Sequence, residues 1–454
     1  MKVLLIEPAY KCKYPPLGLM KISAFHKKRG DEVHFIKGIN SEHRKVIWDR
    51  IYISTLFSFY WDQTINTITY YEFSVKDPQN LFIGGPMATV MASDIEKETG
   101  FKPIRGLLNE KGKLQIKGDH LIDGMVPDYD MLSNISYRYF SDDAYYSYTT
   151  RGCIRKCPFC AVPKIEPVYQ NYIPLKKQIA IIKKEYGEKK DLLLLDNNIL
   201  ASSRFNQIID EIKAVGFFRG AKFNGKNRYV DFNQGVDLRL LTKEKIKILS
   251  EIAIKPLRIA FDNIKYKNEY IKKIEWASKY NLLNLSNYIL YNYNDTPEDF
   301  YDRLKINTEL NEKLGTKIFS FPMKYIPINN KDRKYVSKNW NSRYLRGIQC
   351  ILNATHGVVS PKKEFFEAAF GKNHVEFKKL LLMPDHYIIY REDHKNNGAK
   401  NWNKLFHSLS EKEAHEFLNA IHNNEYEYHS KYRRINKIIS HYKKYRKEYI
   451  SDDM

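Results

Sequence analysis

Apolar and polar residues alternate over the first 100 residues in a way that predicts strands separated by helices. The segment Leu17–Arg29 has its apolar residues at helical spacing and is followed by Gly30. The strand-like apolar runs are Val3–Ile6, Glu32–Ile36, Ile51–Leu56 and Leu81–Ile83. Because strands connected through helices form parallel sheets, we expect residues 1–100 to form a doubly wound α/β domain. Ligands of such domains usually lie beyond the carboxyl ends of the strands.

The alternation is weak in residues 101–143, which we interpret as a linker, and it returns over residues 144–328. The strand candidates there are Tyr145–Thr150, Leu192–Leu195, Val236–Leu240, Leu257–Phe261, Leu285–Tyr291 and Ile318–Phe321. The helix candidates are Leu175–Tyr186 and the segments that begin at the capping residues Ser203, Thr242 and Thr296. These units predict a partial (β/α)6 barrel with its chemistry at the carboxyl ends of the strands. Residues 329–454 are predicted to be mostly helical and basic.

The chain carries 75 Lys and Arg residues against 53 Asp and Glu residues, a formal net charge of +22. This charge favours an anionic partner such as nucleic acid. The alternative is that a Lys-, Asn-, Ile- and Tyr-rich composition reflects an AT-rich genome. No segment approaches the ~20 apolar residues of a membrane helix, and Met1–Glu7 turns acidic too early for a signal peptide. We therefore predict a cytoplasmic protein with no membrane partner.

Three of the five cysteines, Cys153, Cys157 and Cys160, lie within eight residues in a CxxxCxxC pattern. In an intracellular chain this clustering indicates a metal site and not a disulfide framework. Iron–sulfur clusters are usually held by cysteine thiolates. Three thiolates would leave one iron of a four-iron cluster open for chemistry. The alternatives are chance clustering and a structural zinc site, which needs four ligands; the nearest histidines are His120 and His356.

The CxxxCxxC pattern, with the aromatic Phe159 directly before its last cysteine, resembles the signature of the radical S-adenosylmethionine (SAM) superfamily. The resemblance implies a 4Fe–4S cluster whose open iron binds SAM, and a low-potential electron donor of flavodoxin or ferredoxin type. It also implies reductive cleavage of SAM to a 5′-deoxyadenosyl radical, with the protein orienting the substrate and excluding water. Only Cys12 and Cys350 remain, so a second cysteine-rich cluster is not expected.

Further residues at predicted strand ends resemble SAM-binding positions of the same superfamily. Asp196, Asn197 and Asn198 depart from the common Gly-Gly-Glu but are close to an Asp-Asp-Asn variant of cobalamin-linked members; the alternative is an Asx turn. The Asp231–Arg239 segment would place Gln234 and Arg239 near SAM. Arg239 suits a carboxylate, and the alternative is an ion pair with Asp237. Asp262, after the fourth strand, would bond the ribose hydroxyls. Arg155 and Lys156 would offset the cluster charge or simply face solvent.

The N-terminal domain resembles the cobalamin-binding domain that precedes many radical SAM cores. The residues that carry this resemblance are Pro16–Leu19, Gly30–Val33, Gly84–Thr89 and Val126–Tyr129. The Asp-x-His-x-x-Gly motif of members that ligate cobalamin through histidine is absent, and His26 and His34 stand in other contexts. Two interpretations therefore stay open: cobalamin bound without a histidine ligand, or a domain used for docking or substrate.

The C-terminal region contains eight Lys or Arg residues and no acid between Lys431 and Lys447. Its apolar residues recur at helical spacing, and they are Tyr432, Ile435, Ile438, Ile439 and Tyr442. Such an amphipathic helix has a basic face that can follow phosphates. The alternative is a terminal helix whose apolar face is packed and whose basic face is solvated.

The leading functional hypothesis is a single-cluster radical SAM enzyme with a cobalamin-domain-like N-terminus and a large anionic or nucleic-acid substrate. The main alternative is a cobalamin-dependent methyl transfer, rearrangement or carbon-skeleton change on a small molecule or peptide. A third hypothesis is a non-catalytic iron–sulfur or zinc protein that binds nucleic acid.

Overall fold

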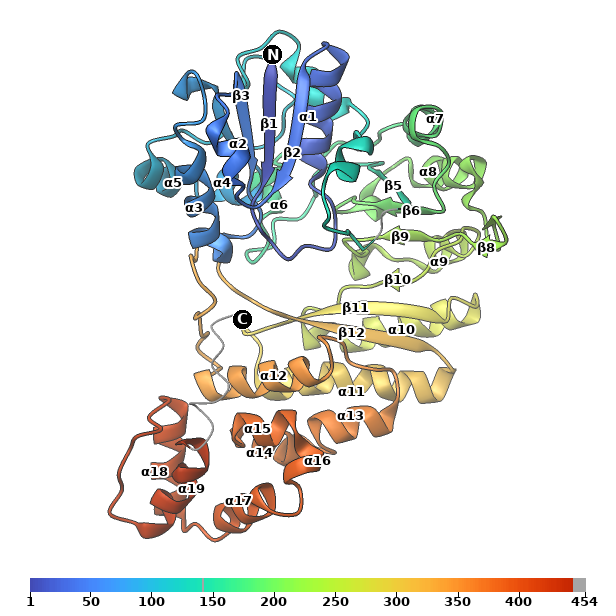
Figure 1. The fold of residues 1–454 in the computed structure, drawn as a ribbon. Coiled ribbons are helices and arrows are strands. Elements are labelled where there is room, and N and C mark those ends of the chain that lie inside the picture. Colours follow the sequence, from blue (N-terminus) through green and yellow to red (C-terminus); the bar gives the residue numbers. More distant parts are fainter. Residues whose placement is uncertain (141–142, 444–454) are drawn as a thin grey trace. The chain divides into compact units, whose positions relative to one another are not determined.

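The computed structural model describes residues 1–140 and 143–443 (Figure 1). The chain forms two compact units. The first contains Met1–Arg258 together with Ile326–Tyr335, and the second contains Ile259–Tyr325 and the chain from Val336 onward. The division into 1–100, 101–143, 144–328 and 329–454 stays a prediction.

The first unit begins with a four-stranded parallel sheet in the order β2-β1-β3-β4. Its strands are β1 (Lys2–Glu7), β2 (Glu32–Lys37), β3 (Arg50–Ser54) and β4 (Leu81–Gly84). Its helices are α1 (Leu17–Lys28), α2 (Ser41–Lys45), α3 (Trp61–Tyr71), α4 (Pro86–Val90) and α5 (Ala92–Thr99). Val3–Ile6 of β1 is fully buried, because a central parallel strand is covered on both faces. The parallel sheet predicted for the first 100 residues is confirmed.

The residues between α5 and β5 are folded against the N-terminal sheet. They form two 3₁₀ segments, η3 (Asp119–Gly124) and η4 (Asp130–Asn134). The Asp128 N–H donates to the Met20 carbonyl of α1 at 3.1 Å, and Ile122 is buried. This predicted linker therefore packs on α1.

A second parallel sheet of the first unit has the order β5-β6-β9. Its strands are β5 (Ala144–Ser147), β6 (Asp191–Leu194) and β9 (Val230–Phe232). The helices that accompany it are α6 (Val162–Ile165), α7 (Leu175–Tyr186), α8 (Phe205–Ile212) and α9 (Lys243–Leu249). A short antiparallel hairpin, β7 (Lys222–Phe223) with β8 (Lys226–Asn227), lies between α8 and β9, and β10 (Leu257–Arg258) follows α9.

Two local predictions in this region are wrong. The strand expected at Val236–Leu240 is a 3₁₀ turn, η7 (Leu238–Leu240), because the Asp237 side chain caps it by accepting the Arg239 N–H. The strand of that region, β9, comes earlier. Ser203 does not cap α8, whose N-terminal flanking residue is Arg204. Thr242 does cap α9, as predicted.

A segment of the chain returns to the first unit after β12 of the second. Within Ile326–Tyr335, the ammonium of Lys331 lies 3.8 Å from the ring centroid of Trp61. The guanidinium of Arg333 lies 4.1 Å from the ring centroid of Phe59. Cation–π contacts of this kind attach the returning segment to the start of α3.

The second unit contains β11 (Asn284–Tyr291) and β12 (Lys317–Lys324), paired in parallel along their whole length. Helix α10 (Lys267–Lys279) precedes β11, and α11 (Pro297–Leu314) connects the two strands. Thr296 and Asp299 form a capping box at the start of α11, as the Thr-Pro-Glu-Asp sequence predicts. The parallel α/β character is confirmed, and closure of the strands into a partial (β/α)6 barrel stays a prediction.

The remainder of the second unit is helical. Its helices are α12 (Ser342–Ala354), α13 (Lys363–Phe370), α14 (His374–Leu382), α15 (Asp385–Ile389), α16 (Arg391–His394), α17 (Gly398–His407), α18 (Glu411–His422) and α19 (Arg433–Lys443). In α19 the residues Ile435, Ile438 and Ile439 are fully buried in one core with Trp402, whereas Arg433, Arg434 and Lys437 are exposed. This matches the packed-helix alternative. Residues 444–447 of the predicted basic helix lie outside the described residues, and nucleic-acid binding stays a prediction.

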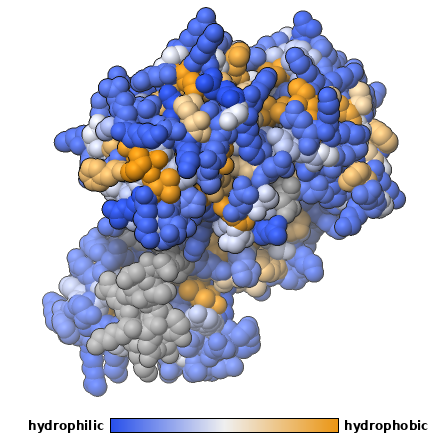
Figure 2. All heavy atoms as spheres, turned by 45° about the horizontal axis from the view of Figure 1, so that its top comes forward, coloured by the Kyte–Doolittle hydropathy of each residue, from blue (hydrophilic) through white to orange (hydrophobic). Residues whose placement is uncertain are grey.

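No helix within residues 1–140 and 143–443 has both the length and the apolar character of a membrane span. The face drawn in Figure 2 is mostly hydrophilic, with hydrophobic side chains scattered across it. A cytoplasmic location stays a prediction.

Candidate functional site

The three clustered cysteines lie on one loop that follows β5. Cys153, Cys157 and Cys160 are each partly exposed and none is in a disulfide. The Cys160 N–H donates to the Cys157 carbonyl at 3.0 Å, which folds the end of the loop. In the described part of the chain, no three His, Cys, Asp or Glu side chains converge as ligands of one metal ion. Phe159 is partly buried beside Cys160.

Gly152 allows the cysteine loop to turn close to residues 166–168. Its φ of +70° is in the left-handed region, and a Cβ there would lie 2.5 Å from the Val168 carbonyl oxygen. Any side chain at this position would therefore force the loop away. The Gly152 N–H also donates to the Glu166 carboxylate at 2.6 Å, so the residue directly before Cys153 is fixed in place.

Asp196 fastens the end of β6 to the start of the cysteine loop. Its carboxylate accepts the Thr149 N–H at 3.0 Å and the hydroxyls of Thr149 and Thr150 at 2.7 Å each. The Thr150 N–H donates to the same carboxylate. Burial raises the pKa of Asp196, and these hydrogen bonds oppose the rise. The partners lie just beyond the neighbouring strand β5, so the carboxylate bonds across the sheet edge and not in an Asx turn on its own backbone. Contact with SAM stays a prediction.

Asn197 and Asn198 both extend toward the cysteine loop. The Asn197 amide donates to Glu166 at 2.8 Å. The Asn198 amide donates to the Cys153 sulfur at 3.3 Å. Asn198 is 2% exposed, and its amide oxygen has no hydrogen-bond partner among the described residues. A buried acceptor without a donor is costly, so this oxygen suits an N–H group of a bound ligand.

Arg239 is paired with Asp237, which is the alternative that the sequence left open. Its guanidinium donates to the two carboxylate oxygens at 2.8 and 3.1 Å. Arg155 of the cysteine loop donates to the same carboxylate at 3.1 Å. Burial acts against the charged carboxylate, but the bonds from Arg239 and Arg155 outweigh it and lower the pKa of Asp237. Arg155 is thus held in an ion pair with Asp237. Gln234, the other predicted SAM contact of this segment, is exposed.

Asp237 first, and then the Cys157 thiol, raise the pKa of Arg239. Two guanidiniums therefore lie at the cysteine loop and share one carboxylate. This arrangement offers positive charge to an anionic sulfur site without leaving either arginine unpaired.

Arg151 and Glu166 also belong to this site, although neither was predicted from the sequence as a site residue. Glu166 is buried and accepts Arg151 at 2.8 Å in addition to Gly152 and Asn197. The signal was present, because Glu166 is the only acid between Asp143 and Glu185, a stretch that includes four basic residues close to the cysteines. An isolated acid among cations indicates a specific pairing.

Asp262 lies in the second unit, after β10, as predicted. Its backbone carbonyl accepts Arg303 at 3.0 Å. Arg303 is fully buried, pairs with Asp295 at 2.6 Å and also donates to the Leu290 carbonyl. The arginine thereby fixes the backbone at Asp262 next to the end of β11. Contact of Asp262 with a ribose stays a prediction.

No protein-family model matches the sequence, and no curated protein matches it. Among solved structures, the fold is similar to that of the radical SAM methyltransferase TsrM from Kitasatospora setae, which has a tryptophan substrate and the SAM analogue aza-SAM bound. The TM-score is 0.52 at 12% identity, over 84% of this chain and 89% of that chain. The cobalamin-dependent SAM radical enzyme OxsB, with aqua-cobalamin and SAM bound, has a TM-score of 0.44 at 12% identity, over 68% of this chain and 52% of that chain.

The likeness to TsrM spans most of both chains. The protein therefore has the fold of the radical SAM enzymes. The resemblance inferred from Cys153, Cys157, Cys160 and Phe159 is confirmed at the level of the fold.

Proposed function

We propose that this protein is a radical SAM enzyme in which Cys153, Cys157 and Cys160 hold one 4Fe–4S cluster. The observation that carries the proposal is the placement of all three cysteines on one loop after a parallel strand, in a chain of that fold. When bound, such a cluster would supply the electron that breaks a carbon–sulfur bond of SAM. The electron itself would come from a flavodoxin- or ferredoxin-type partner.

The surroundings of Cys153 fit a thiolate ligand. Its sulfur accepts the Arg155 N–H and the Asn198 amide N–H, both at 3.3 Å. Hydrogen bonds to sulfur help to set the reduction potential of iron–sulfur clusters.

Two groups of the chain suit the amino acid part of SAM. The unpartnered Asn198 oxygen beside Cys153 would accept an ammonium N–H. Arg239 has five N–H donors and uses only some of them on Asp237, so it can share its guanidinium with a second carboxylate. We propose Asn197, Gln234 and Asp262 as further contacts.

Cleavage of SAM by the reduced protein is the expected result that tests this function. After anaerobic reconstitution the protein should hold about four irons per chain. Reduction with dithionite in the presence of SAM should then release 5′-deoxyadenosine, detected by chromatography and mass spectrometry. A preparation without SAM serves as the control. Stoichiometric zinc with no iron or sulfide would contradict the proposal.

The N-terminal sheet is the proposed place for cobalamin. Its carboxyl edge holds a Tyr10–Tyr60 ring stack at 4.7 Å and Gly85, where a Cβ would lie 2.3 Å from the Thr55 carbonyl oxygen. His26 is buried and bonded to Asp31, so we expect binding without a histidine ligand. Expression with hydroxocobalamin should yield a red protein whose absorption spectrum is that of cobalamin. A colourless product that binds no cobalamin in titration would favour the alternative, a domain used for docking or substrate.

A further inference from the structure

A series of ionic contacts connects helix α1 to the cysteine loop. The ammonium of Lys21 donates to the Asp123 carbonyl and lies 3.8 Å from the Asp123 carboxylate. The same carboxylate oxygen lies 3.5 Å from the Arg151 guanidinium. Arg151 donates to Glu166 at 2.8 Å, and Glu166 accepts the Gly152 N–H at 2.6 Å. The series thus starts in the N-terminal domain and ends at the residue before the first cysteine.

The members of this series are mostly withdrawn from water. The side chains of Lys21, Arg151 and Glu166 are 11%, 7% and 9% exposed. The Lys21 ammonium lies 5.4 Å and the Arg151 guanidinium 4.1 Å from the ring centroid of Tyr148. Burial lowers the pKa of Lys21 to about 8, although Asp123 opposes the shift.

The four charged side chains balance as two cations and two carboxylates. In a poorly solvated site, removing one partner of such a set leaves an uncompensated charge that must find water or another partner. Loss of the Lys21 charge would leave Asp123 and Glu166 to share Arg151. Arg151 would then move toward Asp123, which is 23% exposed, and away from Glu166. The Gly152 N–H bond depends on where Glu166 lies.

We propose that Lys21 is a positioning residue for the cysteine loop, acting through Asp123, Arg151 and Glu166. The consequence is that α1 of the N-terminal domain helps to set the geometry of the cluster ligands, and this consequence rests on the proposed function. The contacts themselves are independent of any cluster.

A second lysine of α1 provides a matched control. Lys27 pairs with Asp128 at 2.7 Å, so it also links α1 to the segment between the two sheets. No contact of Lys27 leads to the cysteine loop among the described residues. Lys27 is more exposed than Lys21, so general loosening of the first unit by K21M must be told apart from the positioning role. General loosening would accelerate exchange across α1 as well, whereas the positioning role predicts acceleration concentrated at the cysteine loop.

The test compares full-length K21M and K27M as apoproteins by hydrogen–deuterium exchange of the peptide that covers residues 149–160. We expect exchange in that peptide to accelerate at least about tenfold in K21M, because the Gly152 N–H loses its fixed acceptor. K27M should exchange like the wild type, and K21R, which keeps the charge, should stay close to it. Equal exchange in K21M and K27M would overturn the proposal. If K21M does not fold, K21Q removes the same charge with a polar side chain of similar length and is expected to accelerate exchange as K21M should.

A second readout uses the reconstituted protein. The midpoint potential of the cluster, followed by electron paramagnetic resonance, should shift in K21M and not in K27M, since hydrogen bonds and charge near the sulfurs set it. If the wild type takes up no cluster, the proposed function fails while the exchange test still decides the role of Lys21. If the cluster loads and neither the exchange nor the potential changes in K21M, the positioning role fails and the proposed function stands.

Discussion

Replacing Cys157 with alanine is expected to abolish iron loading and leave the protein folded. Cys157 is partly exposed, so its truncation should change the free energy of unfolding by less than about 1 kcal/mol. Two remaining thiolates are too few for a cluster that needs three protein ligands. Iron and sulfide content after anaerobic reconstitution measures the loss, and circular dichroism with a thermal melt measures the fold. Formation of 5′-deoxyadenosine should fall to background.

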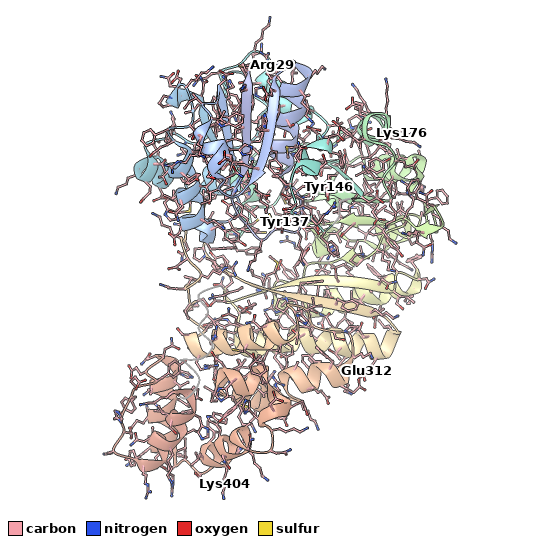
Figure 3. The ribbon with its side chains drawn as sticks, viewed as in Figure 1. Arg29, Tyr137, Tyr146, Lys176, Glu312 and Lys404 are labelled. Carbon is pink, nitrogen blue, oxygen red and sulfur yellow. The ribbon has the colours of Figure 1, made fainter. Side chains whose placement is uncertain are left out.

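Cys12→Ala is the control for this experiment. The Cys12 thiol donates to Glu7 at 2.9 Å, and Tyr137, labelled in Figure 3, donates to the Cys12 carbonyl at 2.7 Å. Burial, followed by the Glu7 carboxylate, raises the pKa of Cys12 to about 12, so it is a neutral thiol at pH 7. This variant should therefore load iron normally. Global unfolding of Cys157→Ala would indicate a structural metal, and iron loss in Cys12→Ala would show that the ligand set is wrong.

Replacing Asp196 with alanine is expected to destabilise the first unit by about 3 kcal/mol or more and to prevent cluster loading. The change would leave the N–H groups and hydroxyls of Thr149 and Thr150 without their acceptor. Each buried donor that loses its partner costs about 1–3 kcal/mol, less whatever water or rearrangement recovers. Urea denaturation measures the stability, and iron content measures the loading.

Asp191→Ala provides the comparison at the opposite end of the same strand. Asp191 is 25% exposed, pairs with Lys190 and accepts one backbone N–H, that of Tyr229 at 2.9 Å, so its loss should cost no more than about 1–2 kcal/mol. Iron loading should be retained. If both variants lose the same stability and both load iron, Asp196 does not hold the cysteine loop.

Elements whose pattern is local and strong could be predicted from the sequence. The continuous apolar run of β1 specifies a strand covered on both faces, and α7 begins and ends where its periodicity does. Thr296 combines a capping hydroxyl, a proline at the first helical position and an acid three residues on, and the observed cap uses them. In these cases neighbouring residues supply the partners, so no knowledge of the tertiary structure is needed.

Elements decided by competing local signals were harder to predict. Val236–Leu240 has strand-like apolar residues, but the Asp237 side chain accepts the Arg239 N–H and thereby favours a 3₁₀ turn over a strand. The β7–β8 hairpin was not predicted, although its turn residues Asn224 and Gly225 form the Asn-Gly pair typical of a two-residue turn. Both residues have positive φ in the structure. Its strands are only two residues long, so no hydrophobic alternation accompanied the turn signal.

The candidate site could be located from the sequence but its partners could not be assigned. The spacing of the cysteines is a local property, whereas Asp196 bonds to residues more than 40 positions away. From the sequence, Arg239 could pair either with Asp237 or with the carboxylate of SAM, because its position near Asp237 allows both partners. The structure shows the pair with Asp237. The residues missed altogether, such as Glu166, matter through long-range contacts.

The return of Ile326–Tyr335 to the first unit has a practical consequence for dissecting this protein. Three separate peptide connections join the two halves, after Arg258, Tyr325 and Tyr335. A fragment that ends at Arg258 would lack Lys331 and Arg333, and would therefore lose their cation–π contacts with Trp61 and Phe59. Deleting either unit as one continuous stretch of sequence therefore also removes part of the other unit. To isolate the first unit, residues 1–258 should be fused to the returning segment Ile326–Tyr335.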